Sequence, residues 1–72
     1  MQYTPKGAYN MEILPYKIYW VFREEPILVA ASHNQTTAII IARELSQRNL
    51  YGYYTVRDSE EHTVYITKEL VL

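Results

Sequence analysis

The chain has 72 residues and a formal net charge of −1, from seven basic and eight acidic side chains. A chain of this length forms one small domain with a thin core. The charge provides no basic stripe of the kind that duplex nucleic acid requires, and the lack of cysteine excludes disulfide bonds and thiolate metal sites. Tyrosine is abundant, with eight residues, and it is favoured where a side chain is partly buried and partly meets a partner.

Residues 1–15 contain two prolines and a glycine and show no sustained hydrophobic period, which predicts an N-terminal arm. The arm carries apolar side chains that need a covering surface. Its start lacks the basic and apolar regions of a signal peptide, and no purely apolar run is longer than that of residues 38–42, which is too short to cross a membrane. A cytoplasmic, intracellular location and no membrane contact are therefore expected.

Residues 16–31 predict a β-hairpin with its turn at residues 23–26, because proline belongs at a turn or at the start of a strand. We take Phe22 opposite Ile27 as the closing pair. The face that includes the even-numbered residues of the first strand, Phe22 among them, is expected to lie under the helix, and it then also carries Val29 and Ala31. The opposite face carries Lys17, Tyr19, Val21, Leu28 and Ala30.

A helix is expected to follow, ending at Gln47 or Arg48. Ser32 is a credible N-cap with Gln35 completing a capping box, and Asn34 is the rival cap. At 100° per residue, one stripe of the helix forms the face that packs on the sheet. This stripe consists of Ala38, Ile41, Ala42 and Leu45.

Ile40 lies outside that stripe, and with Ile39 it forms a small apolar patch bordered by Arg43 and other polar residues. A β-branched residue gains nothing in helix propensity on the solvent side, but it gains if another chain buries it. A two-fold homodimer is therefore expected. The helices could meet at Ile40, or the sheets could meet edge to edge or face to face.

Residues 53–57 and 63–68 predict a second hairpin around the loop 58–62. Pairing Val56 with Val64 and Tyr54 with Ile66 puts four apolar groups on one face, and a one-residue slip would exchange the faces. Tyr65 then lies on the opposite face. The apolar tail, residues 70–72, would extend the last strand.

The expected fold is α+β, of order ββαββ: a four-stranded, mostly antiparallel sheet with one helix on one face. Residues 1–15 form the arm, and residues 16–72 form the single domain. No second helix covers the other face. That face must be covered by the arm, by a second copy of the chain or by a partner.

Catalysis and metal binding have little support. His62 shares its loop with Asp58, Glu60 and Glu61, but no recognised metal-ligand spacing is present. The serines lack a Gly-x-Ser-x-Gly context, and two glycines cannot build a phosphate-binding loop. We expect no enzymatic activity, no metal and no cofactor.

The leading hypothesis is a small protein-binding module that occludes or bridges a protein partner. The residues expected to contact the partner are Tyr19, Tyr53, Tyr65, Arg57 and Lys17 on the sheet, with Ile40 and Arg43 on the helix. The ββαββ pattern with many tyrosines is similar, at the level of fold class, to that of small phage-encoded or accessory bacterial proteins. Several of those proteins inhibit host defence, so the resemblance implies an inhibitor.

The alternative is a single-stranded nucleic-acid binder. Bases would stack on Tyr19, Tyr53 and Tyr65, while Lys17 and Arg57 would contact phosphate. The net negative charge and the lack of an RNP-type motif count against this alternative.

Overall fold

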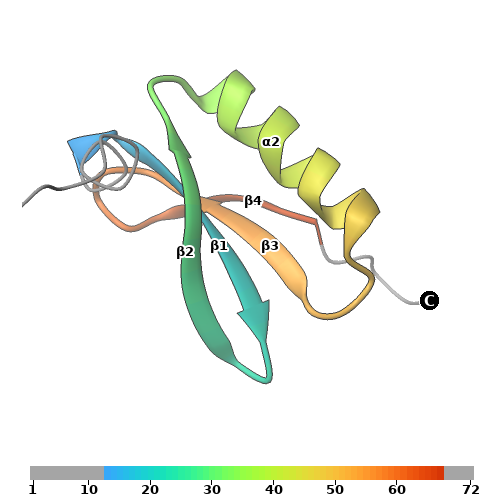
Figure 1. The fold of residues 1–72 in the computed structure, drawn as a ribbon. Coiled ribbons are helices and arrows are strands. Elements are labelled where there is room, and N and C mark those ends of the chain that lie inside the picture. The colour runs from blue at the N-terminus through green and yellow to red at the C-terminus, as the bar shows by residue number, and fades with distance from the viewer. Residues whose placement is uncertain (1–12, 68–72) are drawn as a thin grey trace, which may run out of the picture.

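The computed structural model describes residues 13–67. These residues form β1 (Tyr16–Phe22), β2 (Glu25–Ser32), α2 (Gln35–Arg48), β3 (Tyr53–Arg57) and β4 (Thr63–Ile66). The strands make one antiparallel sheet in the order β2-β1-β3-β4, with α2 on one side (Figure 1). The predicted α+β fold of order ββαββ is confirmed. Most of the predicted arm, residues 1–12, and the tail 70–72 lie outside the described residues.

The β1–β2 turn is shorter than predicted. Arg23 and Glu24 alone form it, with φ values of 55° and 68°. Two successive left-handed residues define a type I′ turn, whose twist matches that of the flanking strands. Phe22 therefore pairs with Glu25, and the predicted pairing of Phe22 with Ile27 is wrong. The sequence concealed this turn because it lacks the asparagine and glycine that a type I′ turn normally uses.

A β-bulge in β2 changes which of its residues face the helix, compared with the prediction. Ile18 pairs with Ala30 and Tyr19 pairs with Leu28, so Val29 is an extra residue in β2. Ala30 packs against the core beside Ile18, whereas Val29 is exposed. The predictions that Val29 faces the helix and that Ala30 faces away from it are both wrong. A single inserted residue reverses the alternation beyond it.

A second bulge corrects the register of β3 and β4. Arg57 pairs with Thr63, but Val56 pairs with Tyr65 and Thr55 pairs with Ile66, which leaves Val64 as the extra residue. The predicted pairing of Val56 with Val64 is wrong. Tyr65 therefore packs against the core on the helix side, and Ile66 moves to the face predicted for Tyr65.

Asn34 is the N-cap of α2. Its Oδ1 accepts a hydrogen bond from the backbone N–H of Thr37 at 2.8 Å. Ser32 is instead the last residue of β2, and its Oγ accepts a hydrogen bond from the Asn34 N–H at 3.4 Å. The prediction of Ser32 as the cap is wrong, and the rival Asn34 is confirmed. The helix ends at Arg48, as predicted.

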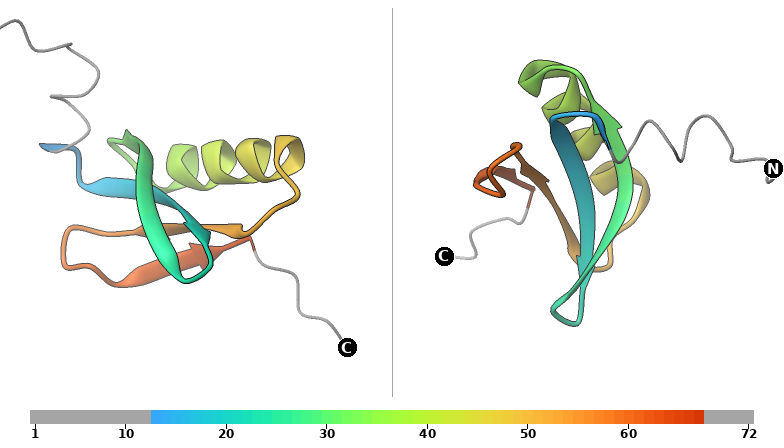
Figure 2. Two further views of the ribbon diagram at one scale, coloured as in Figure 1. Left: turned by 60° about the horizontal axis from the view of Figure 1, so that its bottom comes forward. Right: turned by 90° about the vertical axis from the view of Figure 1, so that its left-hand side faces the viewer.

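The core lies between α2 and the middle of the sheet. Ile18, Val56, Ala38 and Ala42 are completely buried there, and the rest of the predicted helix stripe packs around them. The two alanines let the helix approach the sheet closely. Figure 2 shows α2 lying over the sheet, while the β1–β2 turn projects away from the helix in Figure 1. Phe22, at that projecting end, lies outside the core, which corrects the prediction that it lies under the helix.

Candidate protein-binding surface

The face of the sheet that carries no helix within the described residues is hollowed. The hollow has a volume of about 310 Å³ and is lined by Val21, Glu24, Pro26, Tyr53, Thr55, Arg57, Thr63 and Ile66. These residues come from all four strands and the β1–β2 turn, so the two outer strands contribute to one concavity. The sheet is therefore curled towards this face, and the strong twist is visible in Figure 2. Bulges increase local twist, and each hairpin contains one.

The floor of the hollow is buried although no second layer formed by residues 13–67 covers it. Val21 is 6% exposed and Thr55 is 5% exposed. The Thr55 Oγ1 atom is buried and has no hydrogen-bond partner among residues 13–67. Ile66, on the β4 side, is 49% exposed. The hollow thus combines a covered floor with an accessible apolar wall.

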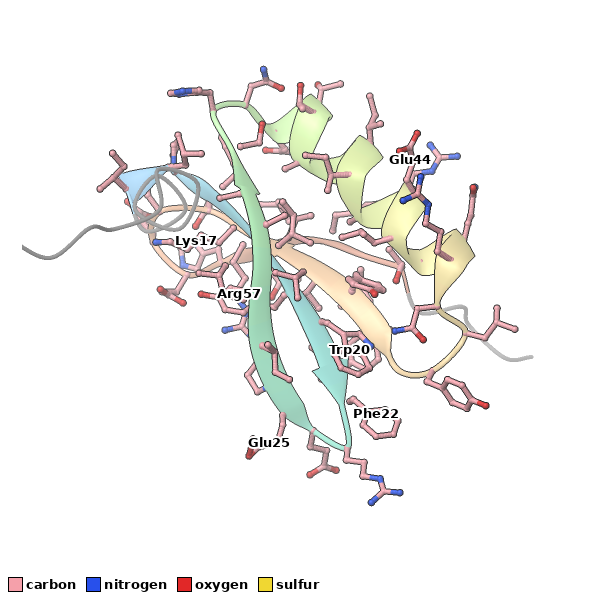
Figure 3. The ribbon with its side chains drawn as sticks, viewed as in Figure 1. Lys17, Trp20, Phe22, Glu25, Glu44 and Arg57 are labelled. Carbon is pink, nitrogen blue, oxygen red and sulfur yellow. The ribbon has the colours of Figure 1, made fainter. Side chains whose placement is uncertain are left out.

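Arg57 occupies the basic end of the hollow. Its guanidinium carbon lies 4.7 Å from the centroid of the Tyr19 ring, which is a cation–π contact. Lys17 is the direct cross-strand neighbour of Arg57, so both cations project from the same face (Figure 3). One nitrogen of Arg57 lies 3.8 Å from a carboxylate oxygen of Glu61.

The structure brings together four of the sheet residues expected to contact a partner. Lys17, Tyr19, Tyr53 and Arg57 share the helix-free face through the β1–β3 register. Tyr65 is separated from them because the bulge in β4 places it on the helix side. The roles of all five in binding stay predictions.

The helix residues of the prediction form a separate surface. Ile40 is 50% exposed on α2, on the side away from the core. Ile40 and Arg43 line a shallow hollow of about 170 Å³ together with Glu44 and Gln47. This surface carries one cation and one anion beside the isoleucine.

Sequence reasoning missed an aromatic group at the projecting end of the sheet. Trp20 and Phe22 stack with ring centroids 5.4 Å apart and an interplanar angle of 14° (Figure 3), and Arg23 lies 5.2 Å from the centroid of the Phe22 ring. Trp20 Nε1 donates a hydrogen bond of 2.9 Å to the carbonyl oxygen of Tyr51. Leu50 is 89% exposed in the same loop. The sequence feature that could have indicated this group is the pair of adjacent apolar residues Leu50 and Tyr51 in the short segment between the helix and the next strand.

The loop 58–62 is closed by hydrogen bonds to the side-chain carboxylate of Asp58. Asp58 Oδ1 accepts hydrogen bonds of 2.9 Å from the backbone N–H groups of His62 and Glu60. The hydrogen bond from His62, reinforced by that from Glu60, holds the pKa of Asp58 below its ordinary value. Among residues 13–67, no three His, Asp or Glu side chains are grouped in a way that could hold a metal ion. The arrangement of this loop is explained by the turn itself.

No family model, curated protein or solved structure matches this chain. In the described part of the chain, no helix has the length and apolar character needed to cross a bilayer. The functional argument therefore depends on the surfaces themselves.

Proposed function

We propose that the protein is a non-enzymatic, cytoplasmic binding module that receives a protein partner in the hollow of its helix-free sheet face. The observation that carries the proposal is the hollow itself, which joins apolar and charged side chains from all four strands. A bound partner segment would be occluded from its other ligands, or bridged to a second molecule. The inhibitor role expected from the sequence is one form of this action.

The size and chemistry of the hollow suit a short part of another protein. A volume of about 310 Å³ is at the lower end of the range for ligand pockets, which is about 300–1,000 Å³. One or two side chains fill such a space better than a large cofactor. Ile66 and Val21 offer apolar contact, and Arg57 offers hydrogen-bond donors, which is the mixture found in protein interfaces.

The backbone at the rim gives independent support. Arg23 and Glu24 both adopt left-handed conformations, which cost a residue with a side chain about 1–2 kcal/mol each. Glu24 lines the hollow. Backbone strain of this kind concentrates at ligand clamps and switch regions.

The nucleic-acid alternative receives less support from the geometry. Base stacking needs accessible ring faces on one surface. Tyr65 lies on the helix side, and the guanidinium of Arg57 covers one face of the Tyr19 ring. Of the three tyrosines proposed for stacking, Tyr53 alone lines the hollow.

A homodimer through α2 is a separate part of the proposal. The surface around Ile40 carries Arg43 and Glu44, and a two-fold axis beside Ile40 would bring the same surface of both copies together. Light scattering of the wild-type chain should give the mass of a dimer, and Ile40→Glu should give that of a monomer. A monomeric wild type, or a dimeric Ile40→Glu variant, would show that α2 is not the interface.

The partner-binding role can be tested with one substitution in the hollow and one outside it. Ile66→Asp puts a charge on the apolar wall, and Leu50→Asp makes the same change at another exposed apolar residue. Each variant, immobilised as the full chain, is exposed to extract from its source cells, and the retained proteins are quantified by mass spectrometry. We expect a partner that the wild type and Leu50→Asp retain and that Ile66→Asp loses.

Equal retention by Ile66→Asp would contradict the proposal. If Leu50→Asp alone fails to retain the partner, the partner binds at the aromatic group around Trp20 and not in the hollow. Retention of no protein by any of the three forms would also count against a binding module. Circular dichroism of each variant separates lost binding from lost folding.

A further inference from the structure

We infer that the basic end of the hollow binds a carboxylate of the partner, supplied by an Asp or Glu side chain of an extended segment. An apolar side chain near that residue would enter the hollow against Ile66. This inference deepens the proposed function and depends on it. The group that binds the carboxylate is Arg57, with Tyr19 beneath it and Lys17 beside it, and we call these three residues the anion clamp.

The first reason is that two cations lie side by side on the sheet. Lys17 and Arg57 are directly opposite each other on neighbouring strands. Like charges in that relation destabilise a sheet. Within residues 13–67, Lys17 makes no ion pair, and Arg57 makes one with Glu61. A carboxylate between the two cations would relieve this repulsion.

The second reason is that Arg57 is already oriented. Its cation–π contact with Tyr19 restricts where the guanidinium can lie, and the N–H donors point outward along the edge of that group. A guanidinium offers a carboxylate two parallel hydrogen bonds. Because the side chain is ordered before the ligand arrives, less conformational entropy is lost on binding.

The third reason is that the existing partner of Arg57 is easily replaced. The contact to Glu61 is long, at 3.8 Å, and the Glu61 side chain is 67% exposed. Exposed pairs of this kind contribute little to stability. The Glu61 carboxylate therefore lies at the position proposed for the partner's carboxylate, and it competes only weakly with that group for Arg57.

The charges at the two ends of the hollow also determine at which end the acidic residue of the bound segment lies. Glu24 lines the hollow at the turn end, and Arg57 lines it towards the other end of β1. Lys17 and Val21 are four residues apart, which is about 13 Å along a strand at about 3.3 Å per residue. The acidic residue of the partner should lie at the anion clamp, away from the repulsion of Glu24.

A carboxylate fits this end better than a phosphate group. Glu61, in the loop that follows Arg57, has a carboxylate oxygen 3.8 Å from a nitrogen of Arg57, so one negative charge already lies at the anion clamp. A phosphate carries about −1.5 to −2 charges at neutral pH, so this loop repels it more than it repels a carboxylate. Mutual repulsion thus favours the singly charged ligand.

The experiment uses peptides, because they define the ligand chemically. A random peptide display library is selected on the full-length protein, and the enriched peptides are synthesised with a fluorescent label. Dissociation constants are measured by fluorescence polarisation at fixed salt concentration. We expect an Asp or Glu at one position of the enriched peptides, near an apolar residue, and weakened binding to Ile66→Asp.

The substitutions at the anion clamp have different expected effects. Arg57→Gln should weaken binding about tenfold or more, because a hydrogen bond to a charged group contributes about 1.5–3 kcal/mol. Lys17→Gln should weaken it a few-fold. Glu61→Gln should strengthen it a few-fold by removing the competing carboxylate. Arg48→Gln, a matched loss of one exposed cation at the end of α2, should leave the dissociation constant unchanged.

The decisive comparison replaces the acidic residue of the peptide by its amide. This change should weaken binding to the wild type as much as Arg57→Gln does, and it should weaken binding to Arg57→Gln little further. The measurement on the wild type requires no folding of a variant chain. Arg57→Lys keeps the charge and loses the paired donors, so it should show a partial loss.

The possible outcomes distinguish this inference from the proposed function. Peptides that need Ile66 but have no acidic position, or that bind Arg57→Gln normally, would refute the carboxylate and leave the binding module intact. Peptides with a phosphate-mimicking pair of acidic residues and no preference for a single one would also refute it. Binding that is indifferent to Ile66→Asp, or the enrichment of no peptide, would refute the proposed function itself.

Discussion

The two faces of the sheet bury neighbouring residues of β3 by different means. Val56 points towards α2 and is completely buried against the core residues of that helix. Thr55, one residue earlier, faces the opposite side and is 5% exposed although no helix covers it within the described residues. A separate layer excludes water from the first face. On the second face, within residues 13–67, the side chains that line the hollow surround the floor.

The second mechanism leaves a different surface chemistry. A packed helix supplies apolar contacts at every position, but a curled sheet leaves its walls exposed, as at Ile66. It also leaves the Thr55 Oγ1 atom without a partner in the described part of the chain. The helix-covered face therefore supplies the buried core, and the curled face is the one on which we propose that a partner binds. Substitutions can test each half of this contrast.

The largest effect is expected at the helix-covered face. Ile18→Ala removes a completely buried side chain and should lower the free energy of unfolding by about 2–5 kcal/mol. A domain of this size has roughly 4–11 kcal/mol in total at about 0.05–0.15 kcal/mol per residue. Urea denaturation measures the change. Val21→Ala, on the curled face, should cost less, about 1–2 kcal/mol, because a smaller group is removed. If Ile18→Ala and Val21→Ala lower the free energy of unfolding equally, the two faces of the sheet do not differ in this respect.

A smaller but substantial effect is expected at Gly52, where the loop after α2 returns to the sheet. Gly52 has a φ of 67°, and a Cβ atom there would overlap the carbonyl oxygen of Val21. Gly52→Ala should lower the free energy of unfolding by at least about 2 kcal/mol, because left-handed strain adds to the clash. It should also change the fluorescence of Trp20, whose indole bonds to the same loop. Tyr51→Ala, at an exposed neighbour, should be nearly neutral in stability.

The smallest effect is expected at Thr55. Thr55→Val replaces the unpartnered hydroxyl by a methyl group of similar size and should raise the free energy of unfolding by about 1 kcal/mol. Thr63→Val, at an exposed position lining the same hollow, should change it by less than about 0.5 kcal/mol. Thermal or urea denaturation of the pair gives the answer. A loss of stability in Thr55→Val would show that the hydroxyl has a favourable contact.

The elements and the helix face could be predicted from local patterns. Alternation along residues 16–22 identified a strand, and the spacing of Ala38 and Ala42 identified the buried side of the helix. The register could not be predicted, because each hairpin contains a bulge that no residue type announces. For the candidate site, Lys17, Tyr19, Tyr53 and Arg57 were placed on one face correctly. Tyr65 and Ile66 exchanged faces at the second bulge.

The sequence by itself determined the order ββαββ, the face of α2 that packs on the sheet and the presence of a second apolar face on β1. Those features depend on the local spacing of apolar residues, within one or two turns of the helix or a few residues of a strand. Only the tertiary structure decided how that second face is covered. The curl of the sheet depends on two bulges and on the pairing of distant strands, so it arises when β2 and β4 are both in place. The hollow between them, with the anion clamp at its end, belongs to no single segment of the chain.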